Sequence, residues 1–313
     1  MSCLYARLRP VGQRQRVSEP FRNIRLLLMV IMNTSTQQGL TLAFIGGGNM
    51  ASALAAGLIG KRCGAHDVLV IDPQADTRER WAQQGVQVAP EAGEALAAKR
   101  IWVFAVKPQV MKAVVAACRP YLTPDTLVVS VAAGIPGSAI SQWLTDENGR
   151  PHERVVRCMP NTPALIGAGA SGLLALGGVS DADRDAVQQL FKATGETTWV
   201  QSDADIDAVT ALSGSGPAYV FYFLEALIDG GVSMGMSPEV ARKLALATLS
   251  GATQLASLSP EPLSVLRDRV TSKGGTTAAA LDVLRTEDVA TSIRHAMEAA
   301  RVRAGELADE FAK

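Results

Sequence analysis

A glycine-rich turn at residues 46–51 has the spacing of a dinucleotide-binding site. Gly46, Gly48 and Ala51 match the pattern G-x-G-x-x-A, between a short apolar segment and a helical one. In this pattern the first glycine allows a tight turn, the second lets the backbone approach a pyrophosphate, and the alanine lets the helix pack closely on the strand. The helix N-terminus offers unpaired N–H groups to the phosphate. We therefore favour a dinucleotide site over an ordinary glycine turn.

Polar residues at two other strand ends would complete this site. Asp72 follows a second apolar segment, and a carboxylate there can accept hydrogen bonds from the adenosine ribose, which favours NAD. Arg78 and Arg80 could instead meet the 2′-phosphate of NADP, and Asp72 could belong to a simple Asp-Pro turn. Lys107 could contact the cofactor or be a solvated lysine. The sequence leaves the choice between NADH and NADPH open.

A second unusual turn covers residues 270–277, which read Val-Thr-Ser-Lys-Gly-Gly-Thr-Thr. It precedes an alanine-rich helical segment, so backbone N–H groups and hydroxyls converge at the start of a helix. Such a convergence suits a small anion, for example a carboxylate. The same residues also fit a threonine-capped helix with a flexible lead.

Strands and helices alternate along the first two thirds of the chain, which predicts an α/β fold with a doubly wound parallel sheet. We expect strands at 42–45, 68–71, 101–106, 127–132 and 155–158, and helices at 50–59, 77–84 and 109–118. After Val200 no comparable strand signal follows, and helical segments are expected at 217–228, 238–255 and 277–311, the last with a break near Thr286. We therefore predict a Rossmann domain at 41–202 and an all-α domain at 203–313.

Composition excludes several classes of protein. The chain has 313 residues, 30 basic and 30 acidic, and 48% hydrophobic residues, which is a globular composition without the basic surplus of a nucleic-acid binder. The seven-residue apolar run at 26–32 is too short for a membrane span of about 20 residues. Four scattered cysteines without a C-x-x-C pair predict no metal site and suit a reducing compartment, so we expect a cytoplasmic protein.

The first 40 residues differ from the rest in charge. Residues 1–32 hold six arginines and one acid, so the remainder carries a net charge of −5 within a neutral chain. We expect residues 1–40 to be a basic, disordered extension. Translation from Met32 would leave most of it without a function, and a targeting or interaction arm is the alternative.

Six stretches taken together resemble the pyrroline-5-carboxylate reductase family. They are residues 44–50 (FIGGGNM), 105–108 (AVKP), 131–134 (VAAG), 157–163 (RCMPNTP), 212–219 (LSGSGPAY) and 270–277 (VTSKGGTT). Their order and spacing fit from about residue 41 to 308, and the last three together are highly specific. The resemblance implies NADPH- or NADH-dependent reduction of 1-pyrroline-5-carboxylate to proline. It also implies a helical dimerisation domain and a homodimer, and dimers of the family often assemble further into decamers.

The resemblance also assigns roles to individual residues. Thr277 would be the catalytic hydroxyl that hydrogen-bonds the pyrroline nitrogen, and Ser272, Gly274, Gly275 and Thr276 would hold the substrate carboxylate. The implied cofactor-binding residues are Ile45, Gly46, Gly47, Gly48, Asn49, Met50, Asp72, Ala105, Val106, Lys107, Pro108, Ala132 and Ala133. Two positions depart from the family: Lys273 replaces the usual proline, and Asp72 stands where NADPH-using relatives often carry a small hydroxyl residue.

A β-hydroxyacid dehydrogenase, which also joins a Rossmann domain to helices, is the alternative. It would need a lysine acid/base on a helix of the second domain. Lys243 is the only helical candidate there, and it lacks the K-x-x-N context because Leu246 occupies the fourth place. Hydride transfer to a protonated imine needs little acid–base machinery, so the absence of histidine from the six stretches fits the reductase.

Overall fold

The computed structural model describes residues 40–311. The expectations for the basic extension, up to residue 39, lie outside this range. Among the described helices, none has both the length and the apolar character of a membrane span.

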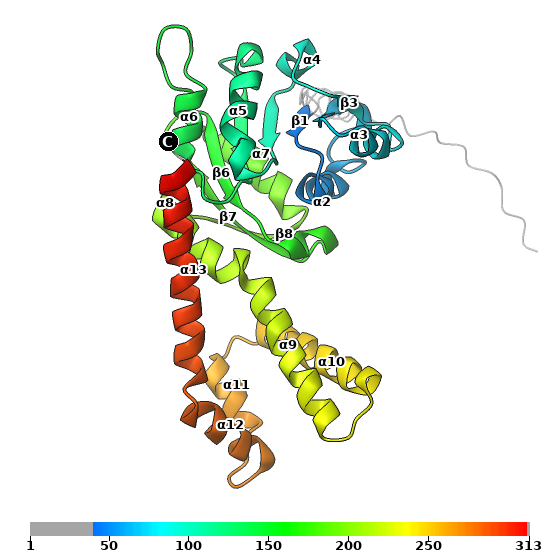
Figure 1. Ribbon diagram of the computed structural model, residues 1–313, viewed down its shortest axis with the longest axis vertical. Helices are drawn as coiled ribbons and strands as arrows, with labels where there is room; N and C mark the ends of the chain where they lie inside the picture. Colours follow the sequence, from blue (N-terminus) through cyan, green and yellow to red (C-terminus); the bar gives the residue numbers. More distant parts are fainter. Residues whose placement is uncertain (1–39, 312–313) are drawn as a thin grey trace, which may run out of the picture. The chain divides into compact units, whose positions relative to one another are not determined.

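An eight-stranded sheet forms the first part of the described chain (Figure 1). Its order is β3-β2-β1-β4-β5-β6-β7-β8, and every neighbouring pair is parallel except the antiparallel β6 and β7. The strands are β1 Leu42–Ile45, β2 Val68–Ile71, β3 Gln87–Ala89, β4 Ile101–Phe104, β5 Leu127–Ser130, β6 Val155–Met159, β7 Gly169–Ala175 and β8 Gly195–Trp199. The chain order reverses direction at β1, between β2 and β4, and ligands of such sheets bind at that switch point.

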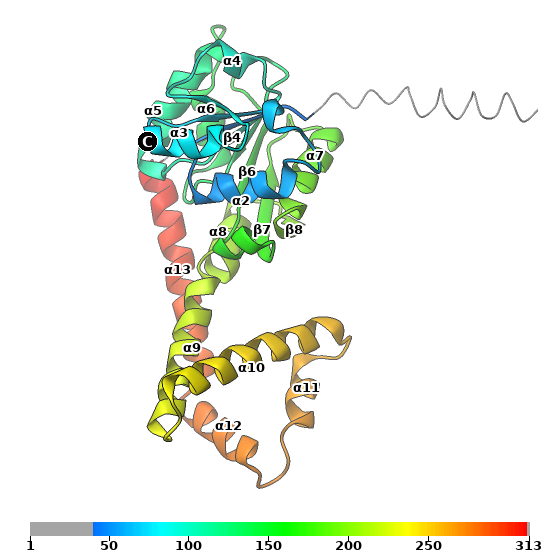
Figure 2. The ribbon, with the colours of Figure 1, turned by 90° about the vertical axis from the view of Figure 1, so that its right-hand side faces the viewer.

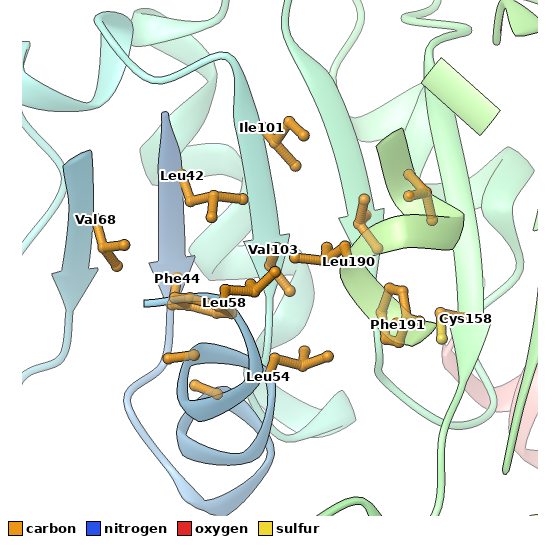
Figure 3. Packing of buried hydrophobic residues seen from close by; sticks show 14 of the residues in the cluster. Leu42, Phe44, Leu54, Leu58, Val68, Ile101, Val103, Cys158, Leu190 and Phe191 are labelled. Atoms are coloured by element: carbon orange, nitrogen blue, oxygen red, sulfur yellow. The ribbon is translucent and has the colours of Figure 1, made fainter. Parts of the chain in front are cut away.

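Helices cover both faces of the sheet, which explains why β1, β2, β4 and β5 are buried along their whole length. One face packs against α2, α3 and α7 through a cluster that includes Phe44, Leu54 and Phe191 (Figure 3). The other face packs against α4, α5 and α6 around Trp102 and Met111. These helices are α2 Asn49–Leu58, α3 Ala75–Ala82, α4 Glu94–Ala97, α5 Pro108–Cys118, α6 Gly137–Trp143 and α7 Asp181–Lys192, with 3₁₀ turns at Ala65–Asp67, Arg119–Tyr121 and Thr162–Ile166.

The remainder of the described chain is helical. It consists of α8 Asp203–Val209, a π-helical turn Thr210–Gly214, α9 Gly216–Ser233, α10 Pro238–Leu258, α11 Leu263–Arg269, α12 Thr276–Thr286 and α13 Val289–Phe311. Ser237 caps α10, as its position before Pro238 predicts, by accepting a hydrogen bond from the Val240 N–H. Helices α9 and α10 pack against each other (Figure 2). The end of α13 returns to the sheet, where Phe311 packs against the core beneath α5 and α6.

Several predicted elements differ from the observed ones. The strands expected at 101–106 and 127–132 end earlier, at Phe104 and Ser130, which form the last pair of the ladder between β4 and β5. The sheet is not wholly parallel, since β7 runs antiparallel to β6. Strands β3, β7 and β8, and helices α4, α6, α7, α8 and α11, were not predicted. By contrast, the break expected near Thr286 is confirmed: α12 ends at Thr286, and Asp288, whose φ of 48° is incompatible with a continuing helix, separates it from α13.

Candidate active site

The first glycine of the turn occupies a position that only glycine fits. Gly46 has φ 98°, and a Cβ built on it would lie 2.6 Å from the backbone oxygen of Ala105. Its N–H donates to the Ile71 carbonyl at 2.8 Å, so the turn is held against the ends of both neighbouring strands. The tight turn predicted from the sequence is therefore confirmed in its geometry.

Gly47, which lies between the two glycines of the pattern, is buried and accepts and donates one hydrogen bond each. Its N–H donates to Asp72 Oδ2 at 2.9 Å, and its carbonyl accepts from Trp81 Nε1 at 3.0 Å. A Cβ at Gly47 would lie 2.8 Å from both Thr77 Cγ2 and Trp81 Nε1. Thr77 and Trp81 were not predicted as part of the site, because a polar helix such as α3 carries no local signal that one of its faces supports the turn.

Gly48, the second glycine of the pattern, faces open space. It is exposed, a Cβ there would meet nothing within 4 Å, and it is the N-cap of α2 without a side-chain hydrogen bond. Within residues 40–311, no acceptor is bound to the Gly48 N–H. The turn is thus a cradle with a free N–H at a helix N-terminus, which is the donor set that a pyrophosphate requires.

A cleft of about 610 Å³ adjoins the turn. Seven of the predicted cofactor residues line it: Ile45, Gly46, Gly48, Asp72, Ala105, Val106 and Lys107. The cleft also has walls that were not predicted, from the segment after β3 and from α5: Pro90, Glu91, Ala92, Val110, Val114, Ala117 and Cys118. Pro90, Glu91 and Ala92 were not predicted because they follow β3, whose sequence carries a weak strand signal.

The other predicted cofactor residues lie outside this cleft. Gly47 and Asn49 line an adjoining hollow of about 130 Å³. Met50 belongs to α2 and packs against the core, and Pro108 is the first residue of α5. Ala132 and Ala133 follow β5, and Ala132 is buried in the core. A role for these residues toward the cofactor stays a prediction.

Charged side chains at the cleft bear on the choice of cofactor. Both carboxylate oxygens of Asp72 already accept backbone N–H groups, from Gly47 and from Gln74, each at 2.9 Å. Arg78 donates to the Asp72 carbonyl at 2.8 Å, so it reinforces the turn. Arg80 lines the cleft and donates to the Thr77 hydroxyl at 3.1 Å. The cleft thus presents one carboxylate and one guanidinium near the end of β2.

The predicted substrate turn lies directly before α12. Gly275 is the helix N-cap and makes no side-chain cap hydrogen bond, so the alternative of a threonine-capped helix is wrong. Gly274 has φ 72°, which a glycine supplies without strain. Ser272, Gly274 and Thr276 are exposed, and Gly275 and Thr277 are half-buried.

The turn and the cleft are not joined within one chain. None of the residues that line the cleft belongs to residues 270–277. Each predicted set of residues is therefore assembled locally, in a different part of the chain.

Helices α9 to α13 expose large apolar side chains. Tyr222 is 77% exposed and Phe221 is 59% exposed, both on α9. The other helices also expose apolar side chains, among them Leu244, Leu255, Leu263, Val283, Ile293 and Val302. Large exposed apolar side chains on several neighbouring helices are typical of a surface that another protein chain covers.

Two family models match the chain. The model described as pyrroline-5-carboxylate reductase dimerisation matches residues 203–307, and the one described as NADP oxidoreductase, coenzyme F420-dependent, matches residues 41–134. The first covers the helices with the exposed apolar side chains, and the second covers the glycine turn and most of the cleft.

Relatives match over most of their length. A pyrroline-5-carboxylate reductase of Pseudomonas aeruginosa is 44% identical over 86% of this chain and 97% of the relative, and one of Pisum sativum is 38% identical over 85% and 96%. Among solved structures, a pyrroline-5-carboxylate reductase from Coxiella burnetii has a TM-score of 0.79 at 34% identity, covering 86% of this chain and 98% of that one. Plasmodium falciparum pyrroline carboxylate reductase with NADP bound has a TM-score of 0.74 at 31% identity, covering 86% and 98%. With this degree of identity over nearly the whole length of its relatives, the chain belongs to the pyrroline-5-carboxylate reductase family.

Proposed function

We propose that this protein reduces 1-pyrroline-5-carboxylate to L-proline with NADH or NADPH, the final step of proline biosynthesis. The observation that carries the proposal is the glycine cradle, which opens onto a cleft at the switch point of the sheet in a chain of this family. The cradle fits the cofactor because Gly46 and Gly47 have no room for a Cβ and Gly48 presents a free N–H.

The cofactor would be held by residues from three strand ends. Gly48 would bind the pyrophosphate, Asp72 or Arg80 would meet the adenosine ribose or its phosphate, and Lys107 would lie beside a phosphate or ribose. When bound, the reduced nicotinamide supplies the hydride that the imine carbon accepts. The chain itself has to align the reactants and exclude water, since a protonated imine is already electrophilic.

The substrate would be held by the turn before α12. Ser272, Gly274, Gly275 and Thr276 would bind the carboxylate through hydroxyls and backbone N–H groups, and the Thr277 hydroxyl would hydrogen-bond the pyrroline nitrogen. The uncapped N-terminus of α12 supports this role, because its N–H groups are free to meet an anion.

The complete site would form in a homodimer. The exposed apolar faces of α9 to α13 support a dimer of interlocked helices, in which the substrate turn meets a cofactor cleft. Further assembly of dimers into decamers is the larger form that we expect from the family. The three described cysteines, Cys63, Cys118 and Cys158, are buried and free, which supports a reducing, cytoplasmic location.

A single assay tests the proposed activity. The purified protein is mixed with NADH or NADPH and 1-pyrroline-5-carboxylate, and the absorbance of the reduced cofactor is followed while proline is measured by mass spectrometry. We expect cofactor oxidation matched by proline formation. Activity on a 3-hydroxy acid, together with no oxidation of either cofactor by the pyrroline, would establish the β-hydroxyacid dehydrogenase instead.

A further inference from the structure

Trp81 of α3 lies directly beneath the glycine turn. Its side chain is 3% exposed, and its ring stacks on Phe44 of β1 with the centroids 6.3 Å apart. The indole Nε1 donates to the Gly47 carbonyl at 3.0 Å. An indole has a single donor and no acceptor, so this bond uses all of its hydrogen-bonding capacity.

The bond fixes the peptide that joins Gly47 to Gly48. The peptide is planar and trans, so its N–H points opposite to its carbonyl. Because the Gly47 carbonyl points at Trp81, the Gly48 N–H points away from Trp81, and Gly48 itself lines the cleft. Asp72 holds the preceding peptide through the Gly47 N–H, so both peptides of Gly47 are oriented by side chains from outside the turn.

A turn of three successive glycines would otherwise have considerable freedom. Glycine reaches both positive and negative φ with little cost, so the Gly47–Gly48 peptide could rotate and turn its carbonyl toward the cleft. A carbonyl there would repel a phosphate, whereas an N–H would bind it. An external donor to the Gly47 carbonyl is the means by which the chain keeps one orientation.

We propose that Trp81 is a positioning residue of the cofactor site, whose indole N–H holds the Gly47 carbonyl so that the Gly48 N–H stays directed at the cofactor pyrophosphate. The proposal rests on the proposed function, since it takes the cleft to be the dinucleotide site. Trp81 itself would make no contact with the cofactor. It acts through the orientation of one peptide.

The test compares Trp81→Phe with Trp102→Phe. Phenylalanine keeps an aromatic ring at position 81 and removes the N–H. Trp102 is a matched control because it is also fully buried, and its Nε1 donates to the carbonyls of Leu96 and Lys99 on the opposite face of the sheet. Both variants lose a buried indole N–H, and only one of them lies at the turn.

The readouts are the dissociation constants of NADH and NADPH by titration calorimetry, and kcat and KM for 1-pyrroline-5-carboxylate at saturating cofactor. For Trp81→Phe we expect both cofactors to bind about tenfold more weakly, the scale of one lost net hydrogen bond, with kcat and the pyrroline KM little changed. For Trp102→Phe we expect lower thermal stability with unchanged cofactor affinity.

The outcomes separate the inference from the function on which it rests. If the wild-type protein bound neither cofactor, the proposed function would fail. The role of Trp81 would be overturned, and the function would stand, in either of two cases. In the first, Trp81→Phe binds the cofactors as tightly as the wild-type protein does; in the second, Trp102→Phe weakens cofactor binding as much as Trp81→Phe does. Should Trp81→Phe not fold, β-(3-benzothienyl)alanine incorporated at position 81 replaces only the N–H by sulfur and gives the same readouts.

Discussion

The two parts of the chain differ in what they bury. In the sheet and its helices, residues 40–199, large side chains such as Trp102, Phe44 and Phe191 are fully buried. Helices α9 to α13 bury only small residues, Gly231, Ala241, Ala245 and Ala304 among those described. The first part, which we call the cofactor half, therefore has its own core, whereas helices α9 to α13, which we call the helical half, leave many of their large apolar side chains exposed.

The same contrast extends to the two predicted sites. The cofactor half assembles the glycine turn, Asp72 and Lys107 around one cleft without help from the helical half. The substrate turn is largely exposed at the start of α12 and makes no wall of that cleft. We infer that cofactor binding needs only the cofactor half, whereas turnover needs the helices to be paired.

A charge placed on the exposed apolar face should have the largest effect. Phe221→Glu would bury an uncompensated carboxylate in the dimer, at a cost of several kcal/mol, so we expect monomers and a loss of activity of roughly 100-fold or more. Sedimentation and the reductase assay measure the two effects. The dissociation constant of NADH should not change.

The control for this variant is Gln142→Glu, which adds the same charge at an exposed position of α6. It should leave both the dimer and the activity intact. A Phe221→Glu protein that remained a fully active dimer would show that α9 is not part of the pairing surface.

Removing the Thr277 hydroxyl should affect turnover alone. Thr277→Ala would remove the hydroxyl proposed to hydrogen-bond the pyrroline nitrogen, and we expect kcat to fall by roughly 100-fold, the usual scale for one hydrogen bond that stabilises a transition state. Thr277→Ser, which keeps the hydroxyl, should retain most of the activity. Cofactor affinity should be equal in all three proteins, and turnover unaltered in Thr277→Ala would refute the role given to this residue.

The fold was predictable where the local pattern is strong. Strands β1 and β2 match the expected residues because four consecutive apolar side chains are bounded by turn residues on both sides. Strand β8 was missed because its Gly-Glu-Thr-Thr-Trp sequence is nowhere fully buried, so that no apolar run announces it. Strand β7 carries two glycines, which weaken a strand signal.

The candidate site divides in the same way. The spacing of Gly46 and Gly48 predicts the turn because the requirement is local to the backbone. Trp81 is 34 residues from Gly47, and its contact with the turn depends on how α3 packs on the sheet. Single-sequence patterns contain no information on such packing, so supporting residues of this kind become visible only in the structure.

Neutralising Asp72 should change the choice of cofactor. Asp72→Asn keeps one oxygen that can accept from the Gly47 N–H, at the cost of the bond from the Gln74 N–H, and it removes the charge that would repel a 2′-phosphate. We expect the ratio of kcat/KM for NADPH over NADH to rise about tenfold, equivalent to about 1.4 kcal/mol. Asp76→Asn, on the exposed first turn of α3, removes a nearby charge outside the cleft and should leave the ratio unchanged. An unchanged ratio in Asp72→Asn would place the ribose elsewhere.

The smallest effect on activity is expected from a change in the core of the cofactor half. Asp183 is fully buried, accepts two hydrogen bonds from Arg154 at 2.8 and 2.9 Å, and accepts another from the Ser180 hydroxyl at 2.8 Å. Burial raises the pKa of Asp183, but the bonds from Ser180 and Arg154 outweigh it, so the pKa lies below its ordinary value. Ionised Asp183 therefore stabilises the fold above about pH 4, the ordinary pKa of an aspartate, and this contribution is lost as the pH falls through the lower pKa of the folded state.

Asp183→Asn leaves the Arg154 guanidinium without its buried partner, so the free energy of unfolding should fall by about 3 kcal/mol at neutral pH. The loss should shrink as the pH falls through the pKa of Asp183, because the wild-type protein loses the same interaction there. The control is Asp125→Asn, since Asp125 lies 3.5 Å from the same arginine but is 99% exposed, and a solvated pair of that kind contributes little. Chemical denaturation followed by circular dichroism measures both variants. At denaturant concentrations below its unfolding transition, Asp183→Asn should keep full turnover and cofactor affinity, because the ion pair stabilises the cofactor half and contacts neither site. A selective loss of turnover would instead show that this core is coupled to the helices.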